Sequence, residues 1–183
     1  MTPLAAIIEV IDRVNRTIGR GIAWLALIMA VVQFVVVILR YVFAIGFIPV
    51  QESIWYLHGI LFMGGAGFTL MHDGHVRIDI FYTGASPRFR SLVDLGGSLV
   101  FLIPICILTV VLSWGYVTNS WRILEGSTEV SGLPLIFLLK TMIWVFAVLV
   151  ALQGIALVAR ALRYLLGETD GYKASADGPG IET

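Results

Sequence analysis

The densest group of polar side chains is one short run, His72-Asp73-Gly74-His75-Val76-Arg77-Ile78-Asp79. Two histidines and two carboxylates are side chains that can bind a metal ion. However, their spacing is short, the run falls in a predicted loop, and no further ligands are available at a matching depth. We therefore expect neither a metal site nor a cofactor. The run is typical of a turn whose histidines and arginine contact lipid headgroups or a partner protein.

Four polar side chains fall inside apolar stretches that are long enough to cross a membrane: Gln33, His58, Lys140 and Gln153. Such positions are costly in a bilayer and mark functional sites by default. A proton relay normally needs a carboxylate at the same depth, and the carboxylates here fall at or beyond the ends of the stretches. Lys140 lies about 9 Å beyond Pro134, so it can reach outward or pair with an outer-loop glutamate. His58 lies about 13 Å beyond Pro49, and we expect it to make an interhelical hydrogen bond.

Other chemistry finds little support in the residues. Cys106 is the single cysteine, which excludes a disulfide or a CxxC redox motif within this chain. No metal site, nucleophile or acid–base pair can be assembled at one depth, so we expect no enzymatic activity. Arg40 and Glu52 fall on the same outer rim and are candidates for an ion pair that closes the first hairpin.

The elements that must position these residues are four apolar stretches of about twenty residues each. A hydrocarbon core of about 30 Å needs about 20 helical residues. With 58% hydrophobic and 13% charged residues, the chain has too little polar surface to dissolve. We predict an all-α integral membrane protein with one four-helix domain over residues 1–167, its spans covering about 21–43, 50–72, 91–115 and 135–160, and a flexible cytoplasmic tail over 168–183.

An amphipathic helix is predicted over about residues 3–20, ahead of the first span. Apolar residues recur there at helical spacing, with charged residues between them. The helix either lies at the membrane surface or against a partner, or simply extends the first span into the cytoplasm. The sequence does not decide between these two arrangements.

The distribution of basic residues predicts the orientation. Nine of the twelve lie on one side of the predicted membrane: Arg13, Arg16, Arg20, Arg77, Arg88, Arg90, Arg160, Arg163 and Lys173. Because basic residues favour the cytoplasmic side, we expect both termini in the cytoplasm. Neutral net charge gives no indication of nucleic-acid binding.

Two further segments are candidates for contacts between proteins. Gly64, Gly65 and Gly67 remove side-chain bulk from one stretch of the second span, which favours close approach of another helix. The second outer loop is the longest polar segment and carries Glu125 and Glu129. A compact protein with a small-residue face and a polar outer loop is typical of a subunit.

The order of these residues resembles a known family. Arg40-Tyr41-Val42-Phe43 closes the first span, Glu52 opens the second, and a glycine-rich span end leads into His75-Val76-Arg77-Ile78-Asp79 and then Ser86-Pro87-Arg88. This pattern resembles the small membrane subunit, of the DctQ type, of bacterial tripartite ATP-independent periplasmic (TRAP) transporters. The resemblance extends from about Ile7 to Leu166.

The resemblance implies a bacterial inner-membrane location and two partners. A periplasmic solute-binding protein delivers an organic acid to a large multi-span subunit, which transports it with an ion gradient, and the small subunit packs against the large one as a scaffold. It implies subunit packing at Gly64, Gly65 and Gly67, an inner-loop anchor at His75, Arg77 and Asp79, and periplasmic docking at Glu125 and Glu129. The alternative is a self-sufficient small homo-oligomeric transporter or channel that uses His58 or Lys140.

Overall fold

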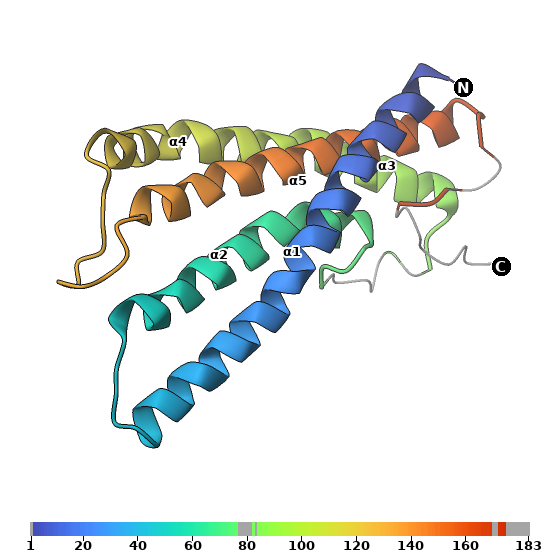
Figure 1. Ribbon diagram of the computed structural model, residues 1–183. Helices are drawn as coiled ribbons and strands as arrows, with labels where there is room; N and C mark the ends of the chain where they lie inside the picture. Colours follow the sequence, from blue (N-terminus) through green and yellow to red (C-terminus); the bar gives the residue numbers. More distant parts are fainter. Residues whose placement is uncertain (1, 77–81, 83, 170–171, 175–183) are drawn as a thin grey trace.

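The computed structural model describes residues 2–76, 82, 84–169 and 172–174 (Figure 1). In this part of the chain all regular structure is helical. Four helical stretches are long and apolar enough to cross a membrane, which confirms the predicted fold class. The elements in chain order are α1 (Pro3–Tyr41), α2 (Ile48–Met71), α3 (Pro87–Gly97), η1 (Ser98–Leu102), α4 (Ile103–Arg122) and α5 (Ile136–Leu165).

The predicted arm and first span form one unbroken helix. α1 has 39 residues, which makes it about 58 Å long and well in excess of the hydrocarbon core. Of the two arrangements open from the sequence, the structure shows the extension of the span. The N-terminal part of α1 is not free, because its buried residues Ile11, Asn15 and Gly19 pack against other helices.

The third span is a single rod with a local change of pitch. α3 runs directly into the π-helical segment η1 and then into α4. Pro104 has no N–H with which to continue the α-helical ladder. At the residue just before this proline, the Ile103 N–H bonds to the Ser98 carbonyl in the wider π pattern. The change of pitch in this rod is therefore a π turn that ends just before Pro104.

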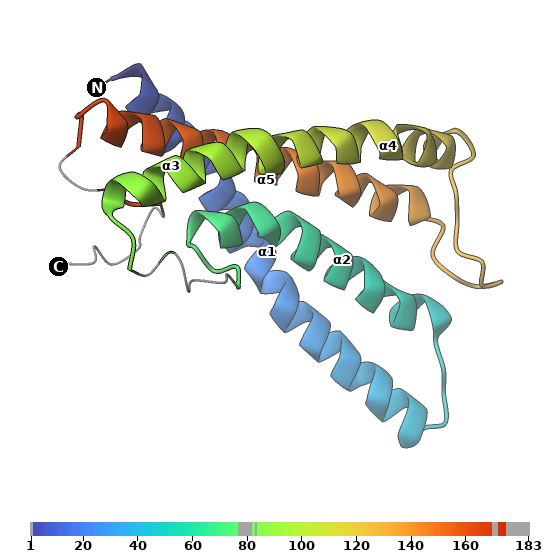
Figure 2. The same ribbon diagram turned by 180° about the vertical axis from the view of Figure 1, so that it is seen from behind.

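The helices form an open row with α5 in the middle. α5 contacts α1, α2, α3, η1 and α4. α1 and α2 form an antiparallel hairpin, while α4 lies on the other side of α5 (Figures 1 and 2). Within the described residues, no Cα atom of α4 comes within 8 Å of one in α1 or α2. Since only α5 joins the two halves, most helix faces stay open.

Small side chains bring the helices together. The buried cluster at the centre consists of Ala66, Cys106, Ala147 and Val150, from α2, α4 and α5. By contrast, the most apolar window of α1 has a mean hydropathy of 2.9 and none of its residues is buried. Apolar side chains that face outward suit contact with lipid or with another membrane subunit.

Candidate functional site

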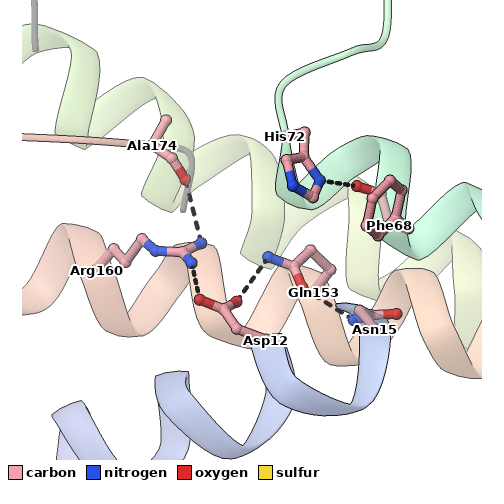
Figure 3. A network of polar contacts seen from close by, with 7 residues as sticks. All are labelled: Asp12, Asn15, Phe68, His72, Gln153, Arg160 and Ala174. Atoms are coloured by element: carbon pink, nitrogen blue, oxygen red, sulfur yellow. Dashed lines mark hydrogen bonds and ion pairs between the residues drawn. The ribbon is translucent and has the colours of Figure 1, made fainter. Parts of the chain in front are cut away.

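A buried polar network joins α1 to α5 at the end of the molecule that holds the N-terminus (Figure 3). Arg160 Nη2 lies 2.5 Å from Asp12 Oδ2, and Gln153 Nε2 donates to Asp12 Oδ1 at 3.3 Å. Asn15 Nδ2 donates to Gln153 Oε1 at 2.9 Å. Gln153 and Asn15 are almost fully buried. We call these four residues the inner clamp, because a charge pair and two amides fix α1 across α5.

The predicted glycine face divides between two environments. A Cβ atom on Gly64 would overlap Ile22 of α1, and one on Gly67 would overlap Asn15 Oδ1 and lie 3.0 Å from the Leu149 carbonyl oxygen. Both glycines therefore serve packing within this chain. A Cβ on Gly65 would meet nothing within 4 Å. Gly65 alone of the three points to open space.

Glu52 holds the loop between α4 and α5. Its side chain is 8% exposed, its Oε2 accepts the Leu133 N–H at 2.6 Å, and its Oε1 accepts the Ser127 hydroxyl. The Ser127 oxygen in turn accepts the Glu129 N–H at 3.1 Å. We call Glu52, Ser127 and Leu133 the outer clamp. It ties a loop more than seventy residues away to α2 near the start of that helix.

The outer clamp replaces the ion pair predicted between Arg40 and Glu52. Among the described residues no ion pair joins these two side chains, and Arg40 is exposed. Because the carboxylate is already bonded by the α4–α5 loop, it is buried beside that loop instead of on the rim of the first hairpin. Glu52 therefore bonds to Ser127 and Leu133, and the partner predicted for it was wrong.

Lys140 pairs with an outer-loop glutamate, one of the two outcomes that its depth predicted. Its Nζ lies 2.5 Å from Glu125 Oε2 and 3.9 Å from the centre of the Tyr116 ring. The hydrogen bond from Lys140 lowers the pKa of the Glu125 carboxyl. Glu129, the other predicted docking residue, has an exposed side chain. Glu125 is thus bonded within this chain, whereas Glu129 is exposed.

The predicted inner-loop anchor is only partly described. His75 is exposed, and Arg77 and Asp79 lie outside the described residues. His72 Nδ1 lies 3.0 Å from the Phe68 carbonyl oxygen (Figure 3). The described residues contain no group of three or more histidine, cysteine, aspartate or glutamate side chains that could hold a metal ion.

Part of the predicted tail contacts the body of the protein. The Tyr172 hydroxyl donates to Asp94 Oδ2 at 2.6 Å, and the Tyr82 hydroxyl donates to the same oxygen at 2.7 Å. Arg160 Nη1 donates to the Ala174 carbonyl oxygen at 3.2 Å. Burial and the neighbouring Asp94 carboxylate raise the pKa of the Tyr172 hydroxyl. Residues 172–174 therefore fix the chain after α5 against α3.

The polar side chains predicted inside the membrane have different surroundings. Lys140 and Gln153 have partners within the chain. Gln33 and His58 are exposed. His58 stacks on Phe62, with ring centres 6.0 Å apart, and it makes no hydrogen bond within the described part of the chain. The predicted interhelical hydrogen bond of His58 is therefore not made inside this chain.

Sequence reasoning missed the contacts that hold the ends of the helices together. Asp12 is one of the charged residues of the predicted amphipathic helix, and Arg160 enters the prediction only as a basic residue that sets orientation. A signal was available, since Asp12 and Asn15 stand three residues apart on one helical face. Their partners follow more than 130 residues later, which the pattern alone does not identify.

Comparison with known proteins assigns the family. Residues 13–164 match the family model of the DctQ component of tripartite ATP-independent periplasmic transporters. Neither a comparison with curated proteins nor one with solved structures gave a match. The matched segment covers most of each membrane-crossing stretch, the outer clamp, and the inner clamp except Asp12. The chain therefore belongs to the DctQ family, the small permease component of TRAP transporters.

Proposed function

We propose that this chain is the static scaffold of its transporter and packs against a large multi-span transport subunit in the bacterial inner membrane. The observation that carries the proposal is that charged side chains at both ends of the helices are bonded within this chain. Asp12 with Arg160, and Glu125 with Lys140, are paired at opposite ends of the helices. Since these charges are already bonded to one another, they are not free to bind a solute along a pathway.

The proposed orientation has both termini in the cytoplasm. Basic residues of α1, α3 and α5 gather at the end that holds the N-terminus and residues 72–76 (Figure 1). Such residues favour the cytoplasmic side. The loops 42–47 and 123–135 then face the periplasm. With its pinned α4–α5 loop and exposed Glu129, that side would offer a docking surface to a periplasmic solute-binding protein.

The transported solute in this proposal is an organic acid, and uptake is driven by an ion gradient. The solute and ion sites would lie in the large subunit, because the charged pairs described above are bonded within this chain. The small subunit contributes rigidity, and the clamps are its means of providing it.

Co-purification and transport assays test the scaffold. The tagged chain is expressed with the large subunit and the binding protein encoded beside it, and partners are identified by mass. We expect a stable complex with the large subunit, and uptake of an organic acid by proteoliposomes only when both membrane subunits and the binding protein are present. Uptake by the large subunit and the binding protein alone would refute the scaffold role.

The self-sufficient transporter makes the opposite prediction. Proteoliposomes that contain this chain alone should then take up solute or conduct ions, and His58→Leu should abolish that activity. The exposed His58 is the observation that favours this alternative. Under the scaffold proposal, liposomes with this chain alone stay inactive.

A further inference from the structure

The outward face of α2 combines a polar side chain with a gap in the middle of an apolar helix. Trp55, His58, Phe62 and Gly65 follow one another at intervals of three and four residues and so share one side of the helix. Trp55 and Phe62 are 68% and 67% exposed. The opposite side of α2 carries Gly64 and Gly67, which pack within the chain. We call the first four residues the His58 face.

His58 lies near the middle of the membrane. It is ten residues beyond Ile48, the first residue of a 24-residue helix, which places it about 15 Å along α2. A lysine near a helix end can extend its long side chain to water, but a histidine at this depth cannot. Lys140, nearer the outer end of α5, already has Glu125 as a partner. Within the described residues, the ring of Phe62 is the one aromatic or polar contact of His58.

If lipid tails covered the His58 face, the imidazole would have no hydrogen-bond partner. Burying a polar group in an apolar medium without such a bond carries a considerable free-energy cost. Ionisable side chains within membrane spans therefore almost always face protein. About two turns beyond His58 on the same face, Gly65 has open space where a side chain would stand. Small residues at such positions let the backbone of a second helix approach closely.

We propose that the His58 face is the surface on which a transmembrane helix of the large transport subunit packs, and that His58 forms a hydrogen bond with that helix. The inference rests on the scaffold function proposed above. The partner helix presents a hydrogen-bonding group at mid-membrane depth, between Trp55 and Phe62, and its backbone approaches Gly65.

A second copy of this chain fits the His58 face less well. A two-fold axis through the face would set Trp55 and Phe62 of each copy against bulky residues of the other, and would leave each imidazole only another imidazole to bind. The family supplies a different membrane component, since its members are parts of a tripartite transporter. The large subunit is therefore the occupant to which we commit.

Site-specific photo-crosslinking in the assembled complex tests the proposal. A benzophenone amino acid replaces His58 in one variant and Leu112 in a second. Leu112 is 74% exposed on α4, on the other side of α5, and serves as the matched control. We expect a strong crosslink from position 58 to the large subunit and a weak one or none from position 112. A crosslink from 58 to a second copy, or none from 58 while the large subunit co-purifies, overturns the proposal.

Substitutions distinguish a hydrogen bond from simple contact. His58→Leu should weaken association with the large subunit by about threefold to thirtyfold, the range for one interhelical hydrogen bond, whereas His58→Gln should retain most of it. If the wild type, His58→Leu and His58→Gln all associate equally with the large subunit, the proposed role of His58 is overturned. If even the wild-type chain fails to bind the large subunit, the scaffold function itself is wrong, and the inference falls with it.

Discussion

Removing the carboxylate of the outer clamp should release the α4–α5 loop without unfolding the helices. Glu52→Ala deletes both oxygens, which accept the Leu133 N–H and the Ser127 hydroxyl. The Leu133 N–H then loses a charge-assisted hydrogen bond, typically worth about 1.5–3 kcal/mol. Since 1.4 kcal/mol corresponds to a factor of ten, local opening should become about 10- to 150-fold more frequent.

Hydrogen exchange measures this opening directly. The amides of residues 127–133, followed by mass spectrometry in detergent or nanodiscs, should exchange faster in Glu52→Ala by that factor. Glu52→Gln should have a smaller effect, because its amide oxygen can still accept the Leu133 N–H. Glu129→Gln is the matched control. This substitution also removes one negative charge, but from an exposed side chain within the α4–α5 loop itself.

The reasoning is refuted if peptides that cover 127–133 exchange at the same rate in Glu52→Ala and in the wild type. It is also refuted if Glu129→Gln accelerates exchange as much as Glu52→Ala does, because the effect would then follow net charge and not the clamp. Exchange in α5 should stay within error in all three variants.

Three further predictions concern other parts of the molecule. Gly67→Ala should lower the melting temperature of the purified chain, because its methyl group overlaps an asparagine of α1, while Gly65→Ala should leave it unchanged; equal effects would contradict the packing described. The lysine partner lowers the pKa of the Glu125 carboxyl, so this contact stabilises the folded chain at pH values above 4.5, the ordinary carboxyl pKa. The stabilisation is lost as the pH falls through the lower pKa of the folded state. On acidification, the melting temperature of the wild type should therefore fall further than that of Glu125→Gln. The pKa of the Tyr172 hydroxyl is raised, so its contact with α3 is fully present below the ordinary pKa of 10.0 and persists above it. Because Tyr172 then stays protonated at pH 11, Tyr172→Phe should leave the tyrosinate absorbance at that pH unchanged. A clear decrease would contradict this placement.

The helices could be predicted from the sequence because their cause is local. Apolar runs of membrane length, and prolines at their starts, placed the second span at about 50–72 and the fourth at about 135–160; α2 and α5 occupy Ile48–Met71 and Ile136–Leu165. Whether the N-terminal helix bends away from the first span depends on tertiary contacts of Asp12 and Asn15. The sequence left that choice open for this reason.

The partners of polar residues could not be predicted in the same way. Glu52 has Arg40 twelve residues before it, and proximity favoured that pair, but the bonds are made to residues 75 and 81 positions later. Likewise, because Gly64, Gly65 and Gly67 are close together in the sequence, they were predicted to form one small-residue face. A helix turns by about 100° per residue, so Gly65 points away from Gly64 and Gly67, and only the positions of α1 and α5 reveal which side is packed.

The open row of helices has a consequence for biogenesis. α1 and α2 emerge first from the ribosome and can pair as soon as both are inserted. In the described structure no Cα atom of α3 or α4 lies within 8 Å of one in that hairpin, and their neighbour α5 is made last. Until synthesis of α5 is complete, the third span stays separate in the bilayer, with Asp12 still lacking Arg160. A chain truncated before α5 would thus lack the helix that packs against both the hairpin and the third span, and Asp12 and Asn15 would lack Arg160 and Gln153.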